Sequence, residues 1–321
     1  MKRRDFIALL GSAATWPLAA LGQPAQGDQP PRPVIGFLNN IASDQWQPAL
    51  NGFSRGLSEA GRVESDNVDF TYRWTDGRTD RLPELAADLA RAKVSVIVAS
   101  ADTKTALAAR SAAPNIPIVF VTEDDPVRFG LVGSLVQPGG HATGIYLTRS
   151  VIDAAVRREF WRLLVPSNQI FLRIEIFDAS SVAAKTDPEA AFAFSFDPAR
   201  RNNPRVVMPP VRALEIDTGP FLDRRRRSEL VSLASRHGIP ALYHWRVFAE
   251  EGGLISYGID IEDVYARMGR YAGAIVNGEN PSLMPVLKPV KFESALNLRT
   301  AAELGLSVSP ELLARVDKVI E

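Results

Sequence analysis

The sequence predicts an α/β fold in which residues 34–146 form a doubly wound lobe around a parallel sheet. Two short runs rich in β-branched residues, 94–99 and 118–121, are typical of strands buried on both faces of such a sheet. Between them lies an Ala-rich stretch of good helix formers, 105–112. Parallel neighbours need a crossover of this kind, which is nearly always right-handed.

The rest of this lobe continues the alternation of strands and helices. We expect strands at 34–38 and 68–72, the second towards a sheet edge, and amphipathic helices at 46–60 and 80–91. Residues 129–135 predict a short helical turn, and 142–146 are expected to cross out of the lobe. The order β-α-β-α-β-α-β with short connections predicts a doubly wound arrangement.

The second half begins with a helix at 151–165, after which the periodicity is lost across 167–217. No glycine occurs between Ile145 and Thr218, although the chain contains 22. Segments 169–177 and 190–196 alternate well enough for strands, but Pro209-Pro210 argues against a central strand at 206–214. Regular patterns return at Pro220. They predict helices at 222–237, 261–277, 300–304 and 310–321, and strands at 241–245, 254–257 and 289–297.

The chain is electrically balanced and contains no cysteine. Lys plus Arg and Asp plus Glu both number 37 in 321 residues, so the sequence has no electrostatic footprint for nucleic acid or an anionic membrane. The absence of cysteine excludes disulfides, thiol chemistry, cysteine metal sites and a lipoprotein anchor. No later stretch approaches the roughly 20 apolar residues of a membrane helix, so we expect no stable membrane insertion.

Residues 1–22 are typical of a signal peptide. Lys2-Arg3-Arg4 supplies the charged start, 6–21 is mostly apolar, and Ala20-Leu21-Gly22 predicts cleavage before Gln23. The paired arginines favour twin-arginine export, with an ordinary Sec signal as the alternative. Either route predicts a mature protein in the periplasm, preceded by a disordered lead-in at 23–33.

Polar strings follow three of the predicted strands of the first lobe. Asn39-Asn40 comes after the first strand, 100–103 after the third, and 122–126 after the fourth. In open α/β sheets, ligands occupy the crevice beyond the carboxyl ends of the strands. Strand-end N–H groups and helix N-termini there favour a carboxylate, and Ser100 or Thr103 can add hydroxyl donors.

With these residues laid out, the chain resembles the ABC-transporter substrate-binding proteins of the type-1 periplasmic binding fold. The matching stretches include P-V-I-G-F-L-N-N, I-P-I-V-F-V-T-E-D-D-P-V, L-V-Q-P-G-G-H-A-T-G, H-G-I-P-A-L-Y-H-W-R-V-F-A and F-E-S-A-L-N-L-R-T-A-A-E-L-G-L. Within these proteins, the chain resembles a group with many paralogues in soil and photosynthetic proteobacteria. With M-K-R-R-D-F-I-A-L-L-G-S-A-A-T-W-P-L-A-A, V-S-V-I-V-A and G-G-L-I-S-Y-G, the matching stretches cover most of 1–166 and 219–321.

The resemblance implies two Rossmann-like lobes joined by crossing segments. The first lobe is 34–146, with about 253–285 returning to it; the second is 147–252; and 286–321 hold a crossing segment and helices. It also implies a monomer without enzyme activity or cofactor that captures a small amino-acid-like ligand. The partners are a membrane permease and its cytoplasmic ATPase. Carried over residue by residue, the ligand contacts are Asn39, Asn40, Ser100, Ala101, Asp102, Thr103, Thr122, Asp125, Tyr243, Trp245 and Tyr257.

Three departures from the family pattern shape the expected ligand and the second lobe. Ala101 and Asp102 stand where the family usually has glycines, and Glu123-Asp124-Asp125 is unusually acidic. These carboxylates favour a cationic or zwitterionic ligand, whose ammonium Asp125 can take, while Tyr243 or Trp245 covers an apolar body. Residues 167–217 do not follow the family's strand-helix-strand pattern. A local frame change there is one hypothesis, and a member that has lost binding is the alternative function.

Three further motifs give rival interpretations. Gly52-Phe53-Ser54-Arg55-Gly56 matches the G-x-S-x-G pattern of serine hydrolases, but it lies inside a predicted helix rather than on a strand-to-helix turn. The acidic loop 123–125 lacks regular spacing for a metal, which leaves a solvated loop. Arg224–Arg227 predict either a solvated helix start or a contact with the permease.

Overall fold

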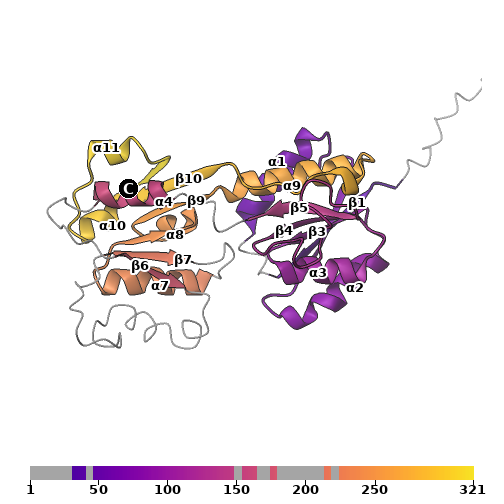
Figure 1. The fold of residues 1–321 in the computed structure, drawn as a ribbon, viewed down its shortest axis with the longest axis horizontal. Coiled ribbons are helices and arrows are strands. Elements are labelled where there is room, and N and C mark those ends of the chain that lie inside the picture. Colours follow the sequence, from indigo (N-terminus) through magenta and orange to yellow (C-terminus); the bar gives the residue numbers. More distant parts are fainter. Residues whose placement is uncertain (1–30, 41–45, 148–153, 165–173, 179–212, 218–223) are drawn as a thin grey trace, which may run out of the picture. The chain divides into compact units, whose positions relative to one another are not determined.

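The computed structural model describes residues 31–40, 46–147, 154–164, 174–178, 213–217 and 224–321. Within the chain, Pro33–Glu321 form one compact unit. Two separate β-sheets run through this unit, and the chain passes from the first sheet to the second and back before it ends in the second (Figure 1).

The first sheet is entirely parallel and has the strand order β2-β1-β3-β4-β5. Its members are β1 (Val34–Asn39), β2 (Asp69–Trp74), β3 (Val96–Ser100), β4 (Ile118–Thr122) and β5 (Ala142–Tyr146). Strands β3 and β4 are buried along their whole length, as their β-branched runs predict, and β2 lies at an edge as expected. The expectation that 142–146 leaves the lobe is wrong, because β5 pairs with β4 as a fifth strand.

Helices cover both faces of this sheet. α1 (Gln47–Glu59) and α9 (Ile261–Val276) lie on one face, and α2 (Leu82–Arg91) and α3 (Thr103–Ala112) lie on the other (Figure 1). The one-turn 3-10 helix η2 (Thr79–Arg81) leads into α2. Alternate residues of each strand therefore enter different cores: Phe37 packs on the α1 side, whereas Leu38 packs on the α2 side.

The second sheet has the order β11-β10-β9-β8-β7-β6, in which only the β9–β10 pair is antiparallel. Its strands are β6 (Ile174–Asp178), β7 (Ala213–Asp217), β8 (Ala241–Tyr243), β9 (Ile255–Ile259), β10 (Phe292–Asn297) and β11 (Lys318–Ile320). Its helices are α4 (Ala154–Leu164), α7 (Arg224–Arg236), α8 (Arg246–Glu250), α10 (Leu298–Glu303) and α11 (Pro310–Leu313). Residues of α7 share a core with Tyr243, and residues of α4 share another with Leu242.

Several expected boundaries differ from these elements. Strand β9 belongs to the second sheet, so only α9 and the segment that follows it return to the first sheet, instead of about 253–285. Residues 129–135 form turns rather than a helical turn. The helix expected at 310–321 ends at Leu313, because Lys318–Ile320 pair with β10 as an edge strand.

The part of 167–217 that the structure describes has regular pairing. Strands β6 and β7 are parallel neighbours, with Ile174 opposite Ala213 and Asp178 opposite Asp217. The strand expected at 190–196 lies outside the described residues, as do 206–212 of the segment 206–214, where Pro209-Pro210 argues against a central strand. The sheet therefore contains a strand from each end of the irregular segment, and the frame-change hypothesis stays a prediction for the residues between them.

Candidate functional site

A polar network lies at the carboxyl edge of the first sheet, on the side of α2 and α3. The amide nitrogen of Asn40 donates to Asp102 Oδ2 at 2.9 Å and to Thr79 Oγ1 at 3.3 Å. The hydroxyl of Thr75 donates to Asn40 Oδ1 at 2.7 Å. The predicted residues Asn40 and Asp102 are thus brought together across the β1 and β3 strand ends.

Asp102 is the N-cap of α3. Its Oδ1 accepts hydrogen bonds from the backbone N–H and the hydroxyl of Thr105, each at 2.7 Å. A side-chain carboxylate at this position satisfies an end N–H and complements the helix dipole. The start of α3 is therefore already occupied by a carboxylate of the protein itself. From the sequence we expect a ligand carboxylate at such a helix N-terminus, but the charge of Asp102 makes this edge better suited to a cationic group of a ligand.

The ends of β3 and β4 are joined by a second network. The hydroxyls of Thr103 and Thr122 hydrogen-bond to each other, and Thr103 also donates to Asp124 Oδ2 at 2.7 Å. Asp125, predicted to bind a ligand ammonium, is exposed and accepts from the N–H groups of Val127 and Arg128. Asp124 is therefore the carboxylate that faces the threonine pair, and Asp125 stabilises the following turn.

On the opposite face of the sheet, Ser100 connects two helices. It accepts from Trp46 Nε1 at 3.2 Å and shares a hydrogen bond of 2.5 Å with the hydroxyl of Tyr265 on α9. Burial raises the pKa of Tyr265 above its ordinary value, and the hydrogen bond to Ser100 opposes that shift. The indole of Trp46 also packs edge-on against Trp74, with ring centroids 5.3 Å apart. Ser100 is thus held in place by protein groups.

Asn39 is the exception in this otherwise satisfied region. It ends β1, lies opposite Trp74 on one side and Ser100 on the other, and has no exposed surface. Neither its Nδ2 nor its Oδ1 has a hydrogen-bond partner among the described residues. Buried amides nearly always have partners, and leaving one unpaired costs about 1–3 kcal/mol. Among the described residues, the site therefore contains a buried donor and a buried acceptor without a partner.

Ala101 adopts a backbone conformation that favours glycine. Its φ of 109° lies in the positive region, where the Cβ of an L-residue is strained. Ser100 and Asp102, on either side of it, are both fixed by hydrogen bonds. These hydrogen bonds on both sides hold Ala101 in the strained geometry.

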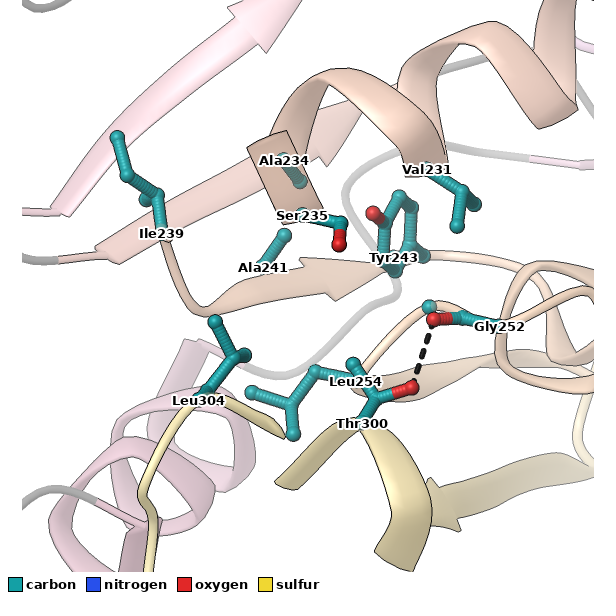
Figure 2. Close-up of a pocket in the computed structure, with 11 residues that line it drawn as sticks. Val231, Ala234, Ser235, Ile239, Ala241, Tyr243, Gly252, Leu254, Thr300 and Leu304 are labelled. Carbon is teal, nitrogen blue, oxygen red and sulfur yellow. Dashed lines mark hydrogen bonds between the residues drawn. The ribbon is translucent and has the colours of Figure 1, made fainter. Parts of the chain in front are cut away.

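The second-lobe residues predicted to contact a ligand occupy different surroundings. Tyr243 is 1% exposed and stacks on Phe248, with ring centroids 4.8 Å apart. It lines a small pocket between α7 and the turn at Gly252 that also contains Thr300 (Figure 2). Strand β8 ends at Tyr243 and Trp245 precedes α8, so the strand expected at 241–245 is two residues shorter and does not include Trp245. Tyr257 packs between Phe160 and Phe292.

Six residues of the networks are absent from the predicted ligand contacts: Trp46, Thr75, Thr79, Thr105, Asp124 and Tyr265. Thr75 was overlooked because β2 extends two residues beyond the predicted end at Tyr72 and places Thr75 at the carboxyl edge. Asp124 lies in the acidic loop, but nothing in the spacing separates it from Asp125. Tyr265 comes from a helix far along the chain, so only tertiary packing brings it to Ser100.

The structure also shows where the serine-hydrolase motif lies. Ser54 is exposed in the middle of α1, and the flanking Gly52 and Gly56 pack against α9. A nucleophile elbow needs a sharp strand-to-helix turn, which this position lacks. The described residues contain no cluster of His, Asp or Glu suited to a metal ion. They also contain no helix long and apolar enough to cross a bilayer.

Sequence comparison assigns the family. The profile described as ABC transporter substrate binding protein matches residues 34–182 and 226–320. The chain belongs to this family. The region between the two matched segments, 183–225, overlaps the stretch 167–217 that departs from the family pattern in the sequence.

Relatives with known names or structures share the fold of this substrate-binding protein. A "Tyrosine-binding protein" of Clostridioides difficile (strain R20291) is 23% identical over 297 residues, which cover 85% of this chain and 81% of that protein. The ABC domain from Streptococcus pneumonia, solved in complex with L-Trp, is 21% identical with a TM-score of 0.69 and covers 90% of this chain and 100% of its own. A conserved domain protein of Vibrio cholerae is 20% identical with a TM-score of 0.71, covering 89% and 99%. This substrate-binding protein has the two-lobed type-1 periplasmic binding fold.

Proposed function

We propose that this chain is the exported solute-binding component of an ABC importer, and that it captures a zwitterionic, amino-acid-like ligand between its lobes. The ligand lies at the carboxyl edge of the first sheet. The protein acts as a monomer in the periplasm. It delivers the ligand to a membrane permease, which a cytoplasmic ATPase drives. The protein itself performs no chemical step on the ligand and needs no cofactor.

The buried amide of Asn39 carries this proposal. Asn39 lies at a strand end beside Trp74 and Ser100, and neither its donor nor its acceptor has a partner among the residues that the structure describes. Leaving such a buried amide unpaired is costly in the ligand-free protein. A ligand that offers a matching acceptor and donor removes that cost. Sites built to hydrogen-bond a ligand group discriminate strongly against analogues that lack it.

The charge at the same edge supports a ligand with an ammonium group. Asp102 and Asp124 supply carboxylates beside Asn40 and Thr103, and Asp102 occupies the start of α3 where a ligand carboxylate would otherwise dock. The relatives named for tyrosine and solved with L-Trp are consistent with an amino acid. Of the remaining predicted contacts, we retain Ala101, Thr122, Trp245 and Tyr257 in the proposed site. Asp125 and Tyr243 have structural roles as a turn cap and a core residue.

Loss of binding is the alternative function, and the observation that favours it is the lost sequence periodicity of 167–217. If these residues do not complete the second lobe, the ligand contacts from that lobe are lost. Asn39 distinguishes a protein that binds a ligand from one that has lost binding. A protein that has lost its ligand gains nothing from keeping an unsatisfied amide in its first lobe.

The test is a thermal-shift comparison of the wild type with Asn39→Leu, using L-tyrosine and L-tryptophan as probes. Replacing the unpaired amide by an apolar group of similar shape is expected to raise the melting temperature of the ligand-free protein and to abolish the ligand-induced shift. Asn51→Leu, an exposed change on α1, is the matched control and should keep the wild-type shift. A ligand-induced shift retained in Asn39→Leu, or no shift in the wild type with any amino acid, would overturn the proposal.

A further inference from the structure

Two segments that connect the sheets run side by side. One links β9 to α9 through Asp260, and the other leads from Leu287, which bonds to β5 of the first sheet, to β10 of the second. The N–H of Asp260 donates to the carbonyl of Lys291 at 3.1 Å, and their side chains form an ion pair of 2.7 Å. A change in the angle between the lobes therefore requires a change in the conformation of these segments.

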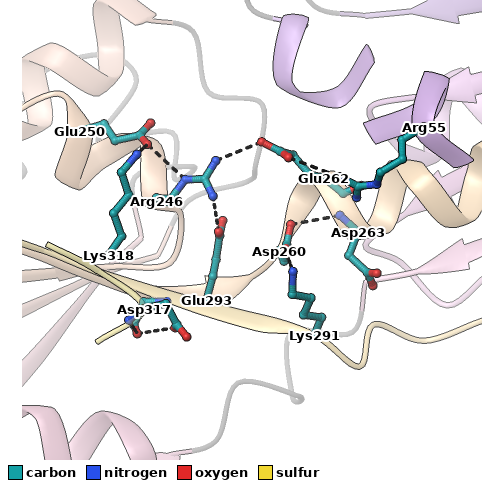
Figure 3. A network of polar contacts seen from close by, with 11 residues as sticks. Arg55, Arg246, Glu250, Asp260, Glu262, Asp263, Lys291, Glu293, Asp317 and Lys318 are labelled. Carbon is teal, nitrogen blue, oxygen red and sulfur yellow. Dashed lines mark hydrogen bonds and ion pairs between the residues drawn. The ribbon is translucent and has the colours of Figure 1, made fainter. Parts of the chain in front are cut away.

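One guanidinium joins three elements at this place (Figure 3). Arg246 of α8 contacts Glu262 in the first turn of α9 at 3.2 Å and Glu293 of β10 at 2.5 Å. It also contacts Glu250 of its own helix at 3.2 Å. Different nitrogens serve Glu262, Glu293 and Glu250, so Arg246 holds α9, β10 and its own helix at the same time.

Glu293 is the partner whose charge is most sensitive to its surroundings. Its side chain is 13% exposed, and burial raises its pKa to about 7; Arg246 opposes this shift, while Asp260 and Glu262 add to it. On its own segment it faces the ammonium of Lys291. The neighbouring strand β11 contributes Lys318, which pairs with Glu250, and Asp317, which accepts from Ser294 (Figure 3).

We propose that Arg246 and Glu293 form a proton-controlled latch on the connection between the two lobes. With Glu293 neutral, the guanidinium is held mainly by Glu262 and Glu250, which ties α8 to the start of α9. With Glu293 ionised, its buried carboxylate is repelled by Asp260 and Glu262 at the start of α9, and this repulsion weakens the connection between β10 and α9. Acid therefore holds the connecting segments in the arrangement described, and alkaline conditions loosen them. The latch goes beyond the proposed function, since it operates whatever the ligand is.

Native-state hydrogen exchange of the ligand-free chain tests the latch directly. Exchange in peptides covering 255–262 and 287–294, corrected for the intrinsic rate, is expected to be about threefold or more faster at about pH 8.5 than at about pH 5.5. Glu293→Gln, which mimics the neutral form, should show the slow rate at both pH values. Glu311→Gln, an exposed change on α11, is the control and should keep the wild-type pH dependence.

A second variant covers the case in which the glutamine destabilises β10. Glu262→Gln weakens the α9 partner of Arg246 and is expected to speed exchange at about pH 5.5. The same pH dependence in Glu293→Gln as in the wild type, or full protection in Glu262→Gln at low pH, would overturn the latch. No ligand enters this experiment, so its result is independent of the test of ligand capture.

Discussion

Gly56 of α1 lies directly against Ala266 of α9. A Cβ built on Gly56 would fall 1.7 Å from the carbonyl oxygen of Ala266, and one on Gly52 would fall 2.3 Å from that of Glu262. The contact is reciprocal, because a Cβ built on Gly269 of α9 would fall 2.1 Å from the carbonyl oxygen of Phe53. The apparent hydrolase motif is therefore one side of a close crossing between two helices that lie far apart in the sequence.

Gly56→Ala is expected to be strongly destabilising. The added methyl group meets a backbone atom that cannot move without separating the helices, and overpacking of this kind typically costs about 1–3 kcal/mol or more. Chemical denaturation measures the loss. Gly140→Ala is the matched control, because no atom lies within 4 Å of its built Cβ. Equal stability of the two variants would contradict the close crossing.

Ala101→Gly is expected to stabilise the protein. The residue has a φ of 109°, and relief of such strain is worth about 1 kcal/mol or more, offset in part by the greater freedom of glycine in the unfolded chain. The melting temperature should rise, and the hydrogen bonds of Ser100 and Asp102 should persist. Ala113→Gly, at a buried position with negative φ, should lower it instead. A fall in melting temperature for Ala101→Gly would show that the strain is not real.

Asp102→Asn separates the capping role of Asp102 from its charge. Asparagine caps helices about as well as aspartate, so the free energy of unfolding should change by less than about 1 kcal/mol. Ligand affinity, by contrast, should fall by about tenfold, because the carboxylate attracts the ammonium of the ligand. Calorimetric titration and denaturation of the same variant check both. Unchanged affinity would show that Asp102 serves only α3.

The raised pKa of Glu293 also predicts how overall stability depends on pH. The pKa is about 7 in the fold against 4.5 for an unperturbed glutamate, so the unfolded chain loses this proton first as pH rises. The favourable contribution is complete below about pH 4.5 and is lost progressively up to about pH 7. The stability of the wild type relative to Glu293→Gln should fall across that window and stay constant above it. Parallel pH profiles for the two proteins would contradict the assignment.

The first lobe was predictable because its patterns are local. The β-branched runs of β3 and β4 and the apolar stripes of α1 and α2 each specify one element, and the strand-end residues Asn40, Asp102 and Thr103 follow from them. Strand β5 was missed as a sheet member because its short sequence, with Gly144 at the centre, carries no strong β signal of its own. Pairing with β4 decides its place.

The contacts within the site were less accessible from sequence. Ser100 was predicted to offer a hydroxyl to a ligand, but Trp46 and Tyr265 already bind it, and Tyr265 is 165 positions away. Tyr243 has a residue type suited to covering a ligand, and only its stacking on Phe248 shows that it belongs to the core. Side-chain partners depend on tertiary packing, which strand ends alone do not specify.

Calorimetric titration of the wild-type protein with L-tyrosine, L-tryptophan and their desamino carboxylic acids tests ligand capture most directly. We predict that an amino acid binds and that the analogue without the ammonium group binds at least about a hundredfold more weakly, since it leaves the carboxylates of the first-lobe edge uncompensated. Equal affinity for an amino acid and its desamino analogue, or no binding of any zwitterion, would contradict it.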